Sequence, residues 1–338
     1  MTTPDGPAAL LPPLASSGPG EWTARRDADI RAVLADPRFT VSPPGPGGPP
    51  GTVSWLRASV SRFANGAEHR ARRDLVEAEL SRLDPDALRA IARELAVGQL
   101  AGCGRPGGRV DVMSLLARRV PVTALAAQLG LAAPLRAAAA VTAIAASYFP
   151  GSDARREQQA DAETAWLVAA LGSARPDLTV ARIAIMVQAC DATAGLVGAA
   201  LHLLQENTGG RAGGDWPTGA LLAETLLRRP PASKFRRVAS ASADVGGQHV
   251  RAGERVVCDI DAAGCDPQAG AHGPGPAAPA GLAFGAGLRP CPGPAHALAL
   301  AAGVIDAVRE RCVLQPGTPV TYEVAPTRVP ERLEVVLR

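Results

Sequence analysis

Apolar residues recur at helical spacing along most of this chain. In DADIRAVLADPRF, residues 27–39, the side chains of Ile30, Val33 and Leu34 fall on one helical face, and Asp36-Pro37 is a pair that ends helices. The same spacing predicts a mainly α-helical protein, with two helices inside 110–148 and further helices at about 67–82, 85–101, 155–173, 179–206, 218–228 and 294–311.

Small β-sheets are expected near the carboxyl end, where the helical spacing stops. Between residues 235 and 262, Gly-Gly separates two β-prone runs, which predicts a hairpin, and the tail contains two further predicted strands. The Pro- and Gly-rich stretches 41–52 and 266–283 are predicted loops. Residues 1–20 have the same character, so we expect a loose amino-terminal segment followed by a single domain over 21–338.

The composition narrows the class of protein. Of the 338 residues, 47% are hydrophobic but only 3% are aromatic, so Ala, Leu and Val must form most of the core. The net charge of +3 is too small to indicate nucleic-acid binding. The amino terminus lacks the basic and apolar stretches of a signal peptide, and the most apolar window, 183–204, contains Asp191 and His202. We therefore expect a cytoplasmic protein with a buried helix there, no membrane span and no nucleic-acid partner.

The spacing of the six cysteines predicts neither a disulfide framework nor a zinc site. None lies in a CxxC pair, and none has the spacing to histidine that zinc sites use. Disulfides are also rare in the cytoplasm.

The segment FGAGLRPCPG, residues 284–293, has the features of a loop built for the thiolate of Cys291. Its glycines allow unusual backbone angles, and Pro290 and Pro292 restrict the chain on both sides of the cysteine. Such a loop aims backbone N–H groups at the sulfur, and a helix amino terminus follows it. Both features stabilise a thiolate and tune a metal bound to it. An ordinary buried cysteine in a Gly-rich turn is the alternative.

The pattern F-G-x-G-x-R-x-C-x-G resembles the haem-binding loop of the cytochrome P450 family. The matching positions are Phe284, Gly285, Gly287, Arg289, Cys291 and Gly293. The resemblance implies a P450-type fold that holds haem b between the long apolar helix and the cysteine loop, with the Cys291 thiolate as axial ligand of the iron. The family often has His where Arg289 stands, and Arg289 can face a haem propionate as a cation.

Two other segments resemble parts of the family that bind haem propionates. In EHRARR, His69 and Arg73 lie four residues apart on one helical face, as in the family's H-x-x-x-R helix. A solvated basic helix face is the alternative. After Pro230-Pro231 the family has a strand with a propionate-binding arginine, for which Arg237 is the predicted residue and Arg236 the alternative in register.

The apolar helix contains ACDATAG, which resembles the family's oxygen-binding stretch. The resemblance assigns Asp191 to proton relay, and the alternative is an Asp that satisfies backbone groups at a helix distortion. The family's hydroxyl residue is replaced by Ala192, and Thr193 follows one position late, about 100° further around the helix. Some family members with Ala at this position use a substrate hydroxyl and water, and others do not activate oxygen.

The sequence departs from the family in two further features, the E-x-x-R helix and the length of the chain. Its E-x-x-R helix reads ETLLR here, with four steps between Glu224 and Arg228 and Thr225 where the glutamate belongs. The chain is also short, with a reduced stretch at 150–180 where lid helices over the substrate would lie.

The resemblance leaves three functions open. The first is a monooxygenase that oxidises a small organic substrate with O2 and electrons from a ferredoxin, which would dock near the exposed arginines Arg70 and Arg72. The second is a haem-thiolate enzyme of non-hydroxylating chemistry, such as oxidative coupling, cyclisation, dehydration or isomerisation. The third is a non-catalytic P450-like partner protein. The composition, rich in Ala, Arg, Gly and Pro, is typical of high-GC bacteria, in which family members often tailor secondary metabolites.

Overall fold

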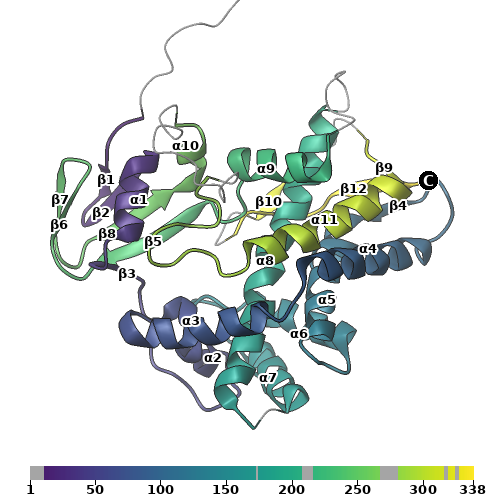
Figure 1. The fold of residues 1–338 in the computed structure, drawn as a ribbon, viewed down its shortest axis with the longest axis horizontal. Coiled ribbons are helices and arrows are strands. Elements are labelled where there is room, and N and C mark those ends of the chain that lie inside the picture. Colours follow the sequence, from purple (N-terminus) through teal and green to yellow (C-terminus); the bar gives the residue numbers. More distant parts are fainter. Residues whose placement is uncertain (1–10, 173, 208–215, 267–280, 316–318, 324–326) are drawn as a thin grey trace, which may run out of the picture. The chain divides into compact units, whose positions relative to one another are not determined.

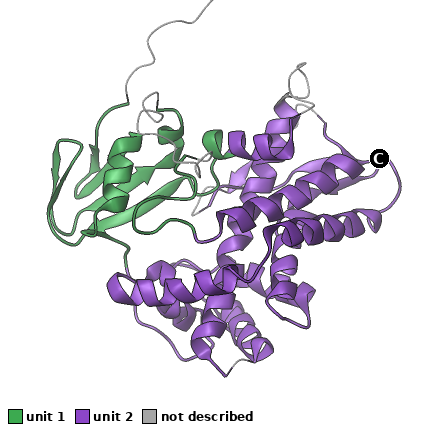
Figure 2. Ribbon diagram, in the orientation of Figure 1, with its two compact units in different colours: residues 1–42, 226–291 green, residues 43–225, 292–338 purple. Residues whose placement is uncertain are grey.

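The computed structural model describes residues 11–172, 174–207, 216–266, 281–315, 319–323 and 327–338. Its contacts divide the chain into two compact units, shown in Figure 2. Unit 1 contains residues 1–42 and 226–291, and unit 2 contains residues 43–225 and 292–338. The units alternate along the chain, and the single domain expected over 21–338 stays a prediction.

Unit 1 is built on a five-stranded sheet with the order β1-β2-β8-β5-β3. Strands β2 and β8 pair in parallel, and the other neighbours are antiparallel. The strands are β1 (Ala15–Gly18), β2 (Glu21–Ala24), β3 (Phe39–Thr40), β5 (Lys234–Ala239) and β8 (Arg255–Asp259). Between β5 and β8, Phe235 lies opposite Cys258 and Arg237 lies opposite Val256.

Helix α1 (Asp27–Ala35) belongs to the core of this unit, as its spacing predicted. Its apolar face, with Ile30, Val33 and Leu34, is buried in one cluster with residues of β8. The short helix α10 (Ile260–Gly264) follows β8. Strands β6 (Ala243–Val245) and β7 (Gln248–Val250) form the predicted hairpin, which turns at two glycines with positive φ.

Unit 2 is helical, and α8 (Pro176–Asn207) is its central element (Figure 1). Helices α3, α5, α6, α7 and α11 all contact α8. The α-helices are α2 (Val53–Ser59), α3 (Gly66–Leu80), α4 (Pro85–Ala101), α5 (Val120–Gln128), α6 (Pro134–Ala145), α7 (Ala154–Leu171) and α11 (Pro294–Arg311). A 3-10 helix η1 (Ser61–Phe63) and a π-helix η2 (Met113–Ala117) complete them, and α9 (Thr218–Arg228) runs along the chain from unit 2 into unit 1.

The long helix α8 is apolar enough over Pro176–Glu206 to cross a membrane, judged by length and composition alone. However, 78% of its most apolar window is buried inside the protein. This burial confirms the prediction of a buried helix at this place.

Two small sheets complete unit 2. One has the order β4-β12-β9, from β4 (Arg109–Asp111), β9 (Cys312–Val313) and β12 (Glu334–Leu337). The other pairs β10 (Tyr322–Glu323) with β11 (Val329–Pro330), and β11 contacts α8.

Two predictions need correction. Part of the segment predicted to be loose is strand β1, because its backbone pairs with β2, whereas residues 1–10 lie outside the described residues. Within the described residues, the tail contains four short strands rather than two, since β9 and β12 find partners in one sheet and β10 and β11 in another. The prediction of two helices inside 110–148 is confirmed by α5 and α6, which follow a short strand and a π-helix. Most of the predicted loop 266–283 lies outside the described residues.

Candidate functional site

The loop that carries Cys291 is closed by its own backbone. The N–H of Cys291 donates to the carbonyl oxygen of Phe284 at 2.7 Å, and the N–H of Gly285 donates to that of Leu282 at 2.8 Å. Gly285 and Gly287 have φ angles of 75° and 65°, in the left-handed region that favours glycine. Cys291 is partly exposed, unlike the buried Cys190, Cys258 and Cys312.

Gly287 is required by a close approach between this loop and the end of α1. A Cβ on Gly287 would lie 2.2 Å from the carbonyl oxygen of Leu34. The same oxygen accepts a hydrogen bond from the N–H of Leu288 at 3.0 Å. Because both contacting groups are backbone, no side chain can move aside to admit a larger residue. Gly287 therefore sets where the loop lies on unit 1.

Strand β5 distinguishes Arg237 from its register alternative, Arg236. Residues two apart on a strand share a face, so Arg237 lies on the face of Phe235. The ring of Phe235 lies 3.8 Å from the place of a Cβ on Gly285, in the cysteine loop. Arg237 is half-buried, whereas Arg236 is exposed. The geometry of unit 1 therefore favours Arg237.

The comparisons with known proteins bear on the fold of the chain. No protein-family model matches the chain. In sequence, 117 residues, 34% of this chain, are 32% identical to the mycinamicin IV hydroxylase/epoxidase of Micromonospora griseorubida, and the match spans 29% of that protein. In structure, P450BioI, solved with an acyl carrier protein ligated to hexadec-9Z-enoic acid, aligns with 94% of this chain and 92% of its own, with a TM-score of 0.74 and 18% identity. The open cytochrome P450 Eryk of S. erythraea aligns with 96% of this chain and 92% of its own, with a TM-score of 0.71 and 22% identity.

The chain has the cytochrome P450 fold. This confirms the fold class expected from the cysteine loop and the helical pattern. The likeness in structure covers 94% of the chain for P450BioI and 96% for Eryk, so it extends well beyond the cysteine loop.

The P450 fold implies a haem, and the donor groups of the Cys291 loop fit one. Within the described residues, no group of three or more His, Cys, Asp or Glu side chains is placed to hold a metal ion. A bare zinc ion takes three or four protein ligands, whereas an iron held by a porphyrin needs one axial thiolate. The single thiol of Cys291, in a loop closed by its own backbone hydrogen bonds, would be enough to supply that one ligand. Arg289 in the same loop and Arg237 on β5 are cations suited to carboxylates such as propionates.

His69 and Arg73 lie one turn apart on α3, as the sequence predicts, and both are largely buried. His69 is 9% exposed. The side chain of Arg73 is 15% exposed, and its Nε forms an ion pair with Glu77 at 2.6 Å. This degree of burial is unlike that of a solvated basic helix face.

Arg72, on the same helix, is less exposed than the sequence predicted. Its guanidinium donates to the carbonyl oxygens of Ala58 at 2.7 Å and Val60 at 3.1 Å, and it pairs with Glu68 at 2.6 Å. These bonds hold the charge at the end of α2, so the prediction that Arg72 is exposed was wrong, whereas docking of a ferredoxin near this helix stays a prediction. Arg70 is exposed as expected.

Asp191 on α8 interacts with a cation that the sequence analysis missed. Its carboxylate lies 3.6 Å from Nε of Arg118, and Arg118 also pairs with Glu323 of β10 at 2.8 Å. Burial raises the pKa of Asp191, Arg118 opposes this effect, and Glu323 adds to it. Arg118 and Glu323 come from different elements, so no local spacing could have pointed to them.

The residues after Asp191 lie on different sides of α8. Ala192 is partly exposed, together with Gln188 and Ala189, which lie one turn before it. Thr193 is 1% exposed, and its hydroxyl has no hydrogen-bond partner among the described residues. The threonine therefore does not occupy the side of the helix that Ala192 occupies, in agreement with their 100° separation.

Thr225 stands where the family's buried glutamate is expected. It is fully buried, and its hydroxyl donates to the carbonyl oxygen of Leu221 in the same helix at 2.7 Å. Threonine has no carboxylate, so the ion pair that the family's glutamate forms cannot form at this position. Glu224 is only partly buried and Arg228 is exposed.

Gly293, the last residue of the loop pattern, immediately precedes α11. A Cβ on Gly293 would lie 3.3 Å from the side chain of Leu80, at the end of α3. His296, a further residue that the sequence analysis missed, bonds through Nε2 to the carbonyl oxygens of Leu80 at 3.0 Å and Leu83 at 3.1 Å. These contacts hold the first turn of α11 against the end of α3.

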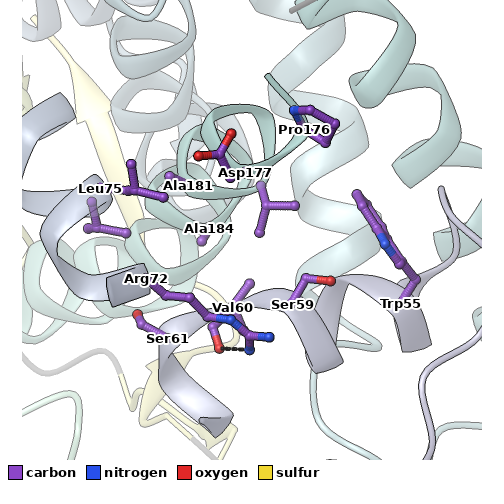
Figure 3. Close-up of a pocket in the computed structure, with 12 residues that line it drawn as sticks. Trp55, Ser59, Val60, Ser61, Arg72, Leu75, Pro176, Asp177, Ala181 and Ala184 are labelled. Carbon is purple, nitrogen blue, oxygen red and sulfur yellow. Dashed lines mark hydrogen bonds between the residues drawn. The ribbon is translucent and has the colours of Figure 1, made fainter. Parts of the chain in front are cut away.

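Unit 2 also contains a cavity of about 270 Å³ (Figure 3). Side chains of α2, α3 and the first turns of α8 form its walls. Most of the lining is apolar, and Arg72 and Asp177 add one charge of each sign. This composition suits a small organic molecule.

Proposed function

We propose that this chain is a haem-thiolate monooxygenase that oxidises a small organic substrate with O2 and electrons from a ferredoxin-type donor. One observation carries the proposal. Cys291 is partly exposed in a loop closed by its own N–H bond to Phe284, within the P450 fold. The relative that shares 32% identity over 117 residues is a hydroxylase/epoxidase, which supports the same reaction class.

The residues that would hold the haem have distinct tasks. Cys291 would supply the thiolate ligand of the iron, and the haem, when bound, would supply oxidation chemistry with O2. Phe284, Gly285, Gly287 and Gly293 would shape the loop around it. His69, Arg73, Arg237 and Arg289 would provide cations or hydrogen bonds for the propionates.

Asp191 would act as the proton relay of the reaction. Its raised pKa lets the carboxyl group hold a proton at a higher pH than an exposed aspartate does. Arg118, 3.6 Å away, would hold the carboxylate in place when it is charged. Asp191 would be the proton donor, because the Arg118 guanidinium keeps its protons and only orients the carboxylate.

The expected substrate and partners are supported by the fold and the composition. We expect a secondary metabolite of a bacterial cytoplasm, and P450BioI shows that one protein of this fold is bound to an acyl carrier protein. An acidic ferredoxin would meet the exposed Arg70, because Arg72 is committed to α2.

The proposal is tested by the carbon monoxide difference spectrum of the reduced, purified protein. We expect the red-shifted Soret band of a haem-thiolate, lost in Cys291→Ser and kept in Cys265→Ser, which changes an exposed cysteine of the same unit. If the protein binds no haem when supplied with excess, both enzymatic functions are excluded and the non-catalytic partner protein remains.

A second function, non-hydroxylating haem-thiolate chemistry, is favoured by the region after Asp191. Ala192 carries no hydroxyl, and the Thr193 hydroxyl is buried. Turnover under isotopically labelled O2 separates the two functions. Label in the product supports the monooxygenase, and oxidised or rearranged product without label supports the alternative.

A further inference from the structure

Helix α2 forms one wall of the cavity in unit 2 (Figure 3), and it needs outside support. It has only seven residues and follows the Pro- and Gly-rich loop 41–52. Helices this short are unstable by themselves. Its N-cap Thr52 accepts one bond from Trp55 at 3.2 Å, which satisfies only one amide. The position of the wall therefore depends on contacts with neighbouring elements.

The buried guanidinium of Arg57 supplies the largest set of these contacts. Arg57 is 5% exposed. It donates to the carbonyl oxygens of Ser147, Tyr148 at 3.2 Å and Phe149 at 3.5 Å, and it pairs with Glu157 at 2.9 Å. These acceptors lie between α6 and α7 and in the first turn of α7. A buried arginine requires such partners, and removing it would leave several carbonyl groups without a donor.

Other contacts also join residues 53–63 to the α6–α7 junction and α7, and each of them involves a different residue. The N–H of Val53 donates to Asp161 of α7 at 2.7 Å. The ring of Phe63 lies 5.5 Å from that of Tyr148, centre to centre. On the opposite side, Arg72 binds the carbonyl groups at the end of α2. Helix α2 is thus held from two sides, by Arg57 toward the α6–α7 junction and by Arg72 toward α3.

Arg57 itself does not line the cavity, whereas Trp55 and Ser59 of the same helix do. We infer that Arg57 is a positioning residue that fixes the α2 wall and so sets which small apolar molecules the cavity admits. The inference rests on the proposed function in one respect: the small apolar molecule in the cavity would be the substrate. The bonds of Arg57 and the cavity do not depend on the haem chemistry.

The test compares Arg57→Met with Arg136→Met in the full-length protein as purified. Arg136 lies on α6, pairs with Glu163 at 2.6 Å and stacks on Trp166, so it provides the same substitution away from α2. Hydrogen exchange should accelerate about tenfold at residues 53–63 and 147–151 in Arg57→Met alone. Exchange in α4 should not change in either variant.

Ligand size gives a second measurement. Titration calorimetry with the slender n-decanol and the bulky 1-adamantanol should show the affinity ratio shifting about tenfold toward the bulky alcohol in Arg57→Met. Ala181→Phe places a larger side chain in the cavity. Binding heat that this variant loses therefore arises from alcohol bound in the cavity. Unchanged exchange and an unchanged ratio in Arg57→Met would overturn the inference.

Arg57→Lys keeps the measurement decisive if Arg57→Met does not fold. Lysine retains the charge but lacks the forked donors of the guanidinium. The exchange rate and the affinity ratio should therefore shift in the same direction as in Arg57→Met, but by less. Wild-type values of both would overturn the inference. Haem content and the carbon monoxide spectrum are recorded separately. A protein without haem that still shows the exchange effect refutes the proposed function but not the role of Arg57.

Discussion

The carboxylate of Asp191 lies 3.6 Å from the guanidinium Nε of Arg118, and the same guanidinium pairs with Glu323. Two acids thus share one cation beside the long helix. Because burial outweighs the attraction of Arg118, the pKa of Asp191 is raised. The arrangement suits a group that exchanges protons rather than one that only forms an ion pair.

Asp191→Asn should increase stability at neutral pH. A carboxyl whose pKa is higher in the folded state than in the unfolded state binds protons better when folded, so its contribution falls as pH rises above the unfolded pKa. The variant should therefore gain melting temperature relative to wild type at pH 7 and lose this gain at acidic pH. The control is Asp177→Asn at the start of the same helix. Arg175 lowers the pKa of that acid, so no gain is expected.

Glu79→Gln should have the opposite pH dependence. Burial by itself would raise the pKa of Glu79, but bonds from Arg182 at 2.5 Å and Arg82 at 3.0 Å outweigh it and hold the pKa below its usual value. The charged form therefore stabilises the fold above the unfolded pKa, and this stability is lost as pH falls through the folded pKa. Chemical denaturation at pH 7 should show a loss of about 3 kcal/mol, because a buried pair between α3 and α8 is broken. Glu68→Gln, which removes an exposed pair on α3, should cost at most about 0.5 kcal/mol, and equal losses in both variants would contradict the prediction.

Two helical glycines should respond to alanine with opposite signs. A Cβ on Gly303 of α11 would lie 2.4 Å from the carbonyl oxygen of Arg89 and 2.9 Å from Cβ of Ala92, so α4 and α11 must separate. Gly303→Ala should lower the free energy of unfolding by about 1–3 kcal/mol. Gly98 of α4 faces open space, and Gly98→Ala should raise it by up to about 1 kcal/mol through helix propensity. Urea denaturation measures both, and a stabilising Gly303→Ala would show that the helices do not pack this closely.

Thiol labelling should sort the six cysteines by burial. Cys103 and Cys265 are exposed, whereas burial raises the pKa of Cys190 and Cys258 to about 12 and that of Cys312 to about 11. A maleimide or disulfide reagent at pH 8 should therefore modify the first two quickly and the other three only on unfolding. Cys291 should react in haem-free protein and be protected once haem is bound. Mass spectrometry of digested protein reads each site, and equal labelling of Cys291 in both forms would argue against ligation.

The sequence predicted the features that depend on neighbours along the chain. Helix α1 follows from the apolar spacing of Ile30, Val33 and Leu34, and the β6–β7 hairpin follows from Gly246-Gly247. The Cys291 loop was recognisable because its glycines, prolines and cysteine act within ten residues. The β1 strand escaped prediction because a Pro- and Gly-rich stretch becomes a strand only when β2 pairs with it.

By itself, the sequence determined a mainly helical protein, a buried apolar helix and a cysteine loop of the P450 kind, since periodicity and turn chemistry are local. Only the tertiary structure decided that the face of β5 with Phe235 and Arg237 lies against the cysteine loop, that the Arg72 guanidinium binds the end of α2, and that Asp191 shares Arg118 with Glu323. Each of these depends on which elements pack together. Burial and electrostatic partners are set by contacts between distant segments, and local sequence does not encode the distances between them.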